Sequence, residues 1–145
     1  MPKKKVLFVC IHNSARSQMA EELLRKLAGD RFEVESAGIE PGTLNPYVVE
    51  ILKEEDIDIS GKQTKAVFDL FKEGRMFQYV IAVCDKEAAE KCPIFPGISE
   101  KIQWSFSDPS QFKGDKEGVL DRVRAIKNEI KTKIEEWLAL QNQDA

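Results

Sequence analysis

The chain has 145 residues, of which 42% are apolar and 32% are charged, and we expect a single domain over 1–145. The net charge of −3 excludes a basic nucleic-acid-binding surface, and the run Lys3–Lys5 is too short to make one. No apolar stretch approaches the roughly 18 residues that span a membrane, and Val6–Val9 is too short for the core of a signal peptide. We therefore expect a cytoplasmic protein, monomeric by default, with no nucleic-acid or membrane partner.

Strand and helix signals alternate along the chain. The apolar run Val6–Val9 predicts a strand buried on both faces, and the spacing of apolar residues over 17–27 predicts a helix that Gly29 ends. Asn45 and Pro46 read as an N-cap and a first helical residue. The same signals predict strands at 32–36, 79–83 and 102–106, helices over 46–52, 66–71 and 119–140, and a short polar helix at 85–91. Four strands separated by helices predict an α/β fold, with a parallel sheet and helices on both faces.

Reactive side chains follow three of the predicted strands. Cys10 comes directly after the first strand, Cys84 directly after the third, and Asp108 shortly after the fourth. In parallel α/β sheets, ligands bind beyond the carboxyl ends of the strands. We therefore expect these three side chains to lie along one edge of the sheet.

The three cysteines of the chain need an explanation other than a disulfide framework. Their number is odd, and thiols are kept reduced in the cytoplasm. Cys10, Cys84 and Cys92 are therefore either buried residues or participants in chemistry.

The loop after the first strand has the composition of an oxyanion site. Backbone N–H groups in a tight strand-to-helix turn converge on one point, and the N-terminus of the following helix adds positive potential. Arg16 supplies a planar guanidinium that can hold two oxygens of phosphate or arsenate. The same field stabilises a thiolate at Cys10, Ser17 can donate a hydrogen bond to it, and Asn13 can brace the loop. The expected substrate-binding residues are Ile11, His12, Asn13, Ser14, Ala15, Arg16 and Ser17.

The same residues allow three other interpretations. Cys10 could be a buried cysteine at a strand end, with Arg16 a surface charge. His12, the only histidine, could act as a base for Cys10, although the positive potential of the loop makes a base unnecessary. Zinc could be bound by His12 and the three cysteines, but their spacing does not match the usual Cys-x2-4-Cys knuckles. We expect neither a metal nor a cofactor.

The segment Val9–Glu21 carries a specific resemblance, which extends through Ser36–Gly38, Cys84-Asp85, Cys92-Pro93, Pro96-Gly97 and Asp108-Pro109. With these residues the chain resembles the thioredoxin-coupled arsenate reductases, which share the fold of the low-molecular-weight protein tyrosine phosphatases. The resemblance implies a four-stranded parallel sheet in the order 2-1-3-4.

The resemblance also implies a reaction sequence with thioredoxin as the partner. Cys10 attacks arsenate, and Asp108 protonates the departing oxygen as a general acid. Cys84 then attacks Cys10 and releases arsenite, and Cys92 attacks Cys84, so that the disulfide moves to the Cys84–Cys92 pair. Thioredoxin reduces this last disulfide, although glutaredoxin or another thiol remains an alternative reductant.

A phosphatase that forms a phosphocysteine at Cys10 is the alternative activity, and a redox sensor without turnover is a third. Phosphatases of this family often carry a second cysteine where this chain has Ala15, and tyrosines where it has Ser110 and Gln111. Their absence, together with Cys84 and Cys92, favours the reductase. The Cys84–Cys92 spacing is one residue longer than in the best-known reductases of this type.

Some members of the family hold a potassium ion near the loop. Asn13, Glu21 and Ser36 match three of its ligands, but Lys65 stands at the position of the fourth, an aspartate. A lysine ammonium at this position could take the place of the ion, so we expect no bound potassium.

Overall fold

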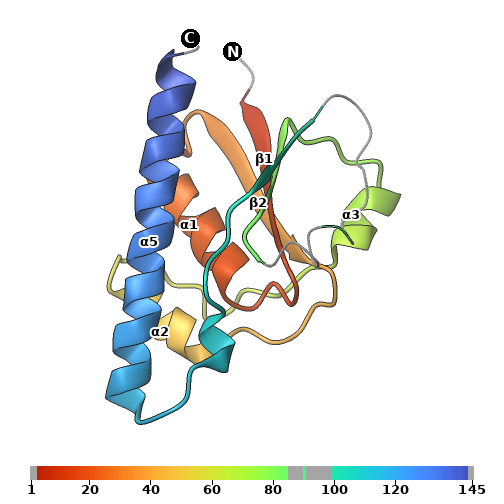
Figure 1. Ribbon diagram of the computed structural model, residues 1–145. Coiled ribbons are helices and arrows are strands. Elements are labelled where there is room, and N and C mark those ends of the chain that lie inside the picture. The colour runs from red at the N-terminus through yellow and green to blue at the C-terminus, as the bar shows by residue number, and fades with distance from the viewer. Residues whose placement is uncertain (1–2, 85–89, 91–98, 144–145) are drawn as a thin grey trace.

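The computed structural model describes residues 3–84, 90 and 99–143 of the chain (Figure 1). Its elements are β1 (Lys4–Cys10), α1 (Arg16–Ala28), β2 (Phe32–Gly38), α2 (Pro46–Lys53), α3 (Val67–Lys72), β3 (Tyr79–Ala82), β4 (Glu100–Gln103), the 3-10 helix η1 (Pro109–Gln111) and α5 (Lys116–Gln143). The strands pair in parallel in the order β2-β1-β3-β4, which confirms the predicted topology.

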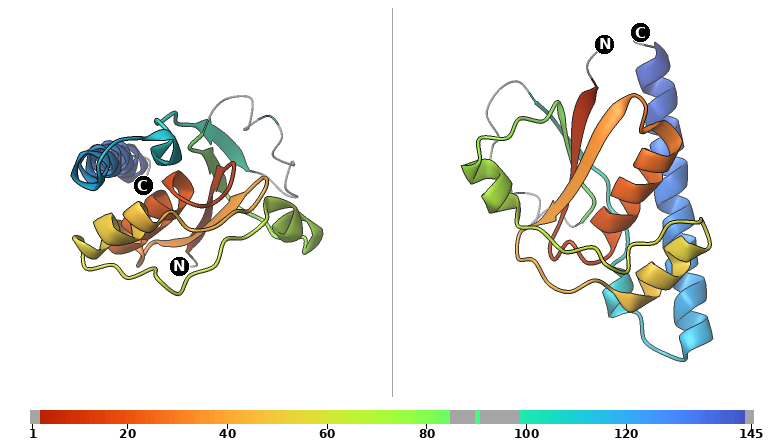
Figure 2. Two further views of the ribbon diagram at one scale, coloured as in Figure 1. Left: turned by 90° about the horizontal axis from the view of Figure 1, so that it is seen from below. Right: turned by 180° about the vertical axis from the view of Figure 1, so that it is seen from behind.

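Helices cover both faces of the sheet, as predicted. Helices α1, α2 and α5 lie on one side and α3 lies on the other (Figure 2). Alternate residues of β1 point to opposite faces, so Val6 and Phe8 join the core under α1 and α5, while Leu7 and Val9 join the core under α3. All four are fully buried, which explains why this strand has a continuous apolar sequence rather than an alternating one.

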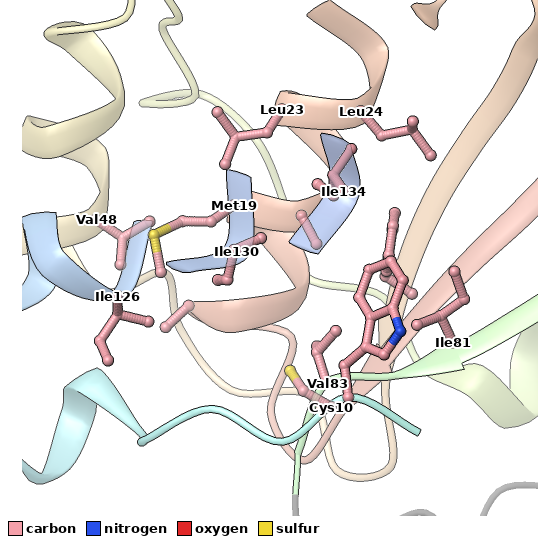
Figure 3. Packing of buried hydrophobic residues seen from close by; sticks show 14 of the residues in the cluster. Cys10, Met19, Leu23, Leu24, Val48, Ile81, Val83, Ile126, Ile130 and Ile134 are labelled. Carbon is pink, nitrogen blue, oxygen red and sulfur yellow. The ribbon is translucent and has the colours of Figure 1, made fainter. Parts of the chain in front are cut away.

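The larger core lies between the sheet and the long helix α5. Ile126, Ile130 and Ile134 of α5 are buried against α1, and in Figure 3 Ile130 lies beside Met19. Near the end of α5, Trp137 stacks edge-on against Tyr79 of β3 at a centroid distance of 5.1 Å. The predicted apolar stripe of this helix therefore packs as expected for one face of an amphipathic helix.

The N-terminus of α2 is capped as its sequence predicts. Asn45 has an extended backbone, its side-chain oxygen accepts a hydrogen bond from the Tyr47 amide at 2.9 Å, and Pro46 takes the first helical position.

The limits of the predicted fourth strand are wrong. The prediction places it at 102–106, whereas β4 covers Glu100–Gln103, and most of its residues are exposed. It is one of the two edge strands, so it has a neighbour on one side only, and Trp104 continues its pairing with a single hydrogen bond to Ala82 O of 2.8 Å. The apolar alternation therefore extends beyond the paired residues. The polar helix predicted at 85–91 falls almost wholly outside the described residues.

No helix in the described part of the chain is both long and apolar enough to cross a membrane.

Candidate active site

The loop from Cys10 to Arg16 is surrounded by an outer segment, residues 39–45, whose backbone amides bind carbonyl groups of the loop. The carbonyls of Cys10, Ile11, His12 and Ser14 accept hydrogen bonds of 2.8–3.0 Å from the amides of Ile39, Glu40, Gly42 and Asn45. Because a peptide N–H points away from its C=O, amide groups of the loop are left to face inward. The strand-to-helix loop thus has the backbone geometry of an anion-binding nest.

Gly38 allows the chain just before the outer segment to approach the backbone of the oxyanion loop closely. A Cβ atom at this position would lie 2.8 Å from backbone atoms of Ile11, His12 and Asn13. Only glycine avoids that clash, so the Gly38 of the Ser36–Gly38 motif serves the shape of the loop.

The Cys10 sulfur lies at the bottom of the loop with two hydrogen-bonding neighbours. The Ser17 hydroxyl oxygen is 2.8 Å from the sulfur, and the Asn13 amide donates to it at 3.1 Å. Cys10 is 3% exposed and Ser17 is fully buried.

Asn13 braces the loop, as expected. Its φ of 55° lies in the left-handed region, which asparagine tolerates better than most residues. Its side-chain amide donates to Ser17 Oγ at 2.8 Å and Ser36 Oγ at 2.9 Å, and its oxygen accepts from the amide of Lys65 at 2.9 Å and from Gln18 Nε2 at 3.1 Å. One side chain thus joins the loop to α1, β2 and the segment before α3.

Arg16 and Asp108 face each other across the site. The Arg16 guanidinium is buried and donates to Phe106 O at 3.1 Å, and its Nη2 lies 3.8 Å from Asp108 Oδ2. The Asp108 side chain is 25% exposed, so it can reach both the loop and solvent. Residues separated by about ninety positions in the chain therefore meet at one edge of the sheet.

His12 points away from the Cys10 sulfur. Its ring is exposed, and Nδ1 lies 2.8 Å from Glu40 O in the outer segment. A Cys–His pair is therefore not formed. Across the described residues, no group of three or more histidine, cysteine or acidic side chains is arranged to hold a metal ion.

Cys84 lies at the same sheet edge as Cys10. Val83 donates to Val9 O at 2.9 Å, and Cys84 Sγ is 3.8 Å from that same carbonyl, one residue before Cys10. Cys84 is fully buried, and its own carbonyl accepts a hydrogen bond from Gln103 Nε2. Cys92, the third predicted redox residue, lies outside the described residues.

The lysine predicted at the cation position is the wrong one. Lys65 Nζ pairs with Glu35 at 3.0 Å, whereas Lys62 Nζ lies 2.7 Å from Glu21 Oε1. Ser36 donates to the same Glu21 oxygen at 2.5 Å. A lysine ammonium therefore pairs with the Glu21 carboxylate, so the residues present do not fit a potassium ion at this place. This ammonium belongs to Lys62 and not to Lys65.

The Glu21 carboxylate is 3% exposed and is kept ionised by its neighbours. Burial by itself would raise the pKa of Glu21, but the Lys62 charge and hydrogen bond, the Ser36 hydroxyl and Arg25 together hold that pKa below its usual range. Lys62 had no signal in the sequence, because no local motif shows which lysine of a loop reaches a distant carboxylate.

Three comparisons with known proteins bear on this site. The family model described as low molecular weight phosphotyrosine protein phosphatase matches residues 5–145. An arsenate reductase of Halalkalibacterium halodurans is 39% identical over 136 residues, which cover 92% of this chain and 94% of that protein.

Two solved structures are also similar. The thioredoxin-dependent arsenate reductase of Corynebacterium glutamicum is 30% identical with a TM-score of 0.63; the match covers 92% of this chain but only 63% of that longer one. An arsenate reductase in its oxidized state is 27% identical with a TM-score of 0.75, and the match covers 94% of this chain and 97% of that one.

Proposed function

Because the chain belongs to the low molecular weight phosphotyrosine protein phosphatase family, we propose that it uses the cysteine chemistry of that fold to reduce arsenate to arsenite. The observation that carries the proposal is the position of Cys84. Its sulfur lies 3.8 Å from the Val9 carbonyl, one residue before Cys10, so a second buried cysteine lies at the same edge of the sheet as the proposed nucleophile. A phosphatase needs one cysteine, whereas a two-electron reduction needs a pair.

The first step is attack of the Cys10 thiolate on arsenate. The inward-facing loop amides and the Arg16 guanidinium hold the oxyanion, and the Ser17 hydroxyl lies 2.8 Å from the attacking sulfur. A sulfur–arsenic bond forms and an arsenic–oxygen bond breaks. Asp108 protonates the leaving oxygen, which departs as water.

The second step transfers the electrons. The Cys84 thiolate attacks the Cys10 sulfur, a disulfide forms, and the sulfur–arsenic bond breaks with its electron pair going to arsenic. Arsenic leaves as arsenite, and the two thiols have become one disulfide. The proximity of β1 and β3 supports this step, since the two strands pair at Val9 and Ala82.

The last steps return the enzyme to its thiol state. Cys92 attacks Cys84, which releases Cys10 and moves the disulfide to the Cys84–Cys92 pair. Thioredoxin, the reductant named for the Corynebacterium glutamicum relative, then reduces that pair. The chain acts in this proposal as one domain over 1–145, as a monomer, without cofactor or metal, in the cytoplasm where thiols are kept reduced.

The test couples the protein to thioredoxin, thioredoxin reductase and NADPH. Arsenate-dependent NADPH oxidation is expected for the wild type and is expected to vanish in Cys10→Ser, Cys84→Ser and Cys92→Ser. Cys92→Ser should still release one arsenite per protein in a single turnover and stop with Cys10 and Cys84 joined. No oxidation by fully reduced wild-type protein would contradict the proposal.

The same variants separate reduction from hydrolysis. Hydrolysis of an aryl phosphate requires only attack by Cys10, which forms a phosphocysteine, and the hydrolysis of this intermediate by water. Cys84→Ser should therefore keep any aryl phosphatase activity, while Cys10→Ser should lose it. A wild type that hydrolyses aryl phosphates and leaves arsenate untouched would identify a phosphatase instead.

A further inference from the structure

Asn45 makes more hydrogen bonds than its role as a helix cap requires. Its backbone amide donates to Ser14 O of the oxyanion loop at 3.0 Å, and its side-chain oxygen accepts from the Tyr47 amide. Its side-chain nitrogen donates to Ser110 Oγ at 3.2 Å, sixty-five positions further along the chain. Asn45 is 9% exposed, whereas its partner Ser110 is exposed at the surface.

Ser110 is in turn bonded to the candidate general acid. The Ser110 amide donates to Asp108 Oδ1 at 3.0 Å, and this bond caps the short helix η1. The other Asp108 oxygen faces Arg16 at 3.8 Å. Pro109, which lies between Asp108 and Ser110 in the chain, is buried and anchors this turn. A continuous path therefore runs from the loop carbonyl of Ser14 through Asn45 and Ser110 to the Asp108 carboxylate.

We propose that Asn45 is a positioning residue, which sets where the Asp108 carboxylate stands relative to the oxyanion loop. The inference rests on the proposed role of Asp108 as general acid. The backbone of Asn45 is bonded to the oxyanion loop, and its side chain is bonded to the turn Asp108–Ser110, which we call the acid turn. Asn45 therefore fixes the position of the acid turn relative to the loop. Proton transfer in the first step depends on that distance, because general acids act only within hydrogen-bond reach of the leaving atom.

The capping role can be separated from the positioning role. A helix cap needs a side-chain oxygen, and serine supplies one about as well as asparagine. The bond to Ser110 needs the amide nitrogen, which serine lacks. Asn45→Ser therefore removes the link to the acid turn while retaining the cap of α2 and the backbone bond to Ser14.

Two variants at Ser110 approach the same bond from the other side. Ser110→Ala deletes the acceptor oxygen but keeps the backbone amide that holds Asp108. Ser110→Thr keeps the hydroxyl and is the matched control. We expect kcat for arsenate to fall about tenfold in Asn45→Ser and Ser110→Ala, with KM unchanged, and Ser110→Thr to stay within about twofold of the wild type.

The decisive comparison repeats Asn45→Ser in an Asp108→Asn background. If Asn45 acts through the acid, its substitution there should change kcat by less than about twofold, because the proton donor is already gone. A further tenfold loss in that background would overturn the proposal and leave Asn45 a purely structural residue.

A second measurement does not depend on turnover. Backbone order parameters of residues 108–112, measured by NMR relaxation in the reduced protein, should fall from about 0.85 towards about 0.6 in Asn45→Ser, while those of α2 stay high. Unchanged order at 108–112 would refute the link even if the protein proved inactive on arsenate. Failure of the proposed reductase function and failure of this inference therefore give different results.

Discussion

Replacement of Lys62 by methionine tests whether the buried Glu21 carboxylate depends on this one ammonium. The change keeps most of the length of the side chain and removes its charge. Lys62 is 22% exposed and Glu21 is 3% exposed, so the pair is largely shielded from solvent. Breaking a buried pair by removing one partner typically costs about 3–5 kcal/mol, because the remaining charge is left without compensation. Arg25 still pairs with Glu21 in the variant, so we expect the lower end, about 3 kcal/mol at pH 7.

The dependence of this loss on pH gives the sharper test. In the wild type the pKa of Glu21 is lowered, so its stabilising contribution is present above the unfolded pKa of about 4.3 and is lost as pH falls through the lower folded value. Without Lys62, burial becomes the dominant influence and raises the pKa of Glu21. The penalty is then greatest above that raised pKa and declines as acidification protonates the carboxylate. The deficit of Lys62→Met should therefore shrink by about 1 kcal/mol or more between pH 7 and pH 5.

Urea denaturation followed by tryptophan fluorescence measures this deficit directly. The protein has two tryptophans, Trp104 and Trp137, and both are buried, so their emission reports on the core. In a thermal scan, the expected 3 kcal/mol corresponds to about 6–12 °C in Tm for a domain of this size.

Lys65→Met is the matched control, because it makes the same chemical change in the same segment. The Lys65 side chain is 37% exposed and pairs with Glu35, so its loss should cost no more than about 1 kcal/mol. The double variant Lys62→Met/Glu21→Gln should recover much of the deficit, since it also removes the uncompensated charge. Equal losses for the two lysine variants, or a Lys62→Met deficit that does not decline on acidification, would refute the reasoning.

Three further outcomes follow from the loop. Gly38→Ala should destabilise the protein by about 2 kcal/mol and weaken phosphate binding in a titration, because its Cβ would meet loop backbone at 2.8 Å; Gly61→Ala, with open space around it, should be neutral. Arg16→Lys should raise KM for arsenate by about tenfold or more, since an ammonium cannot hold two oxygens at once. Ser17→Ala should slow iodoacetamide alkylation of Cys10 about tenfold, because the sulfur loses the hydroxyl group that lies 2.8 Å from it; an unchanged rate would show that Ser17 does not activate Cys10.

Local patterns accounted for the strands and helices that pack in the centre of the fold. The run Val6–Val9 predicted a strand buried on both faces because its neighbours cover it on both sides. Asn45 and Pro46 predicted the start of α2 because capping involves atoms only a few residues apart. Prediction failed at the edge strand β4, because the apolar pattern does not show where a strand loses its neighbour.

The sequence by itself determined the chemistry of the oxyanion loop. Cys10, Asn13, Arg16 and Ser17 lie within eight consecutive residues between a strand and a helix, so their meeting is a consequence of local geometry. Tertiary structure alone decided which distant groups serve that loop. It selected Lys62 over Lys65 for Glu21, turned His12 outward to Glu40, and joined Asn45 to Ser110. These contacts depend on the path of separate segments across the sheet edge, and that path is set by packing of the whole core rather than by any local pattern.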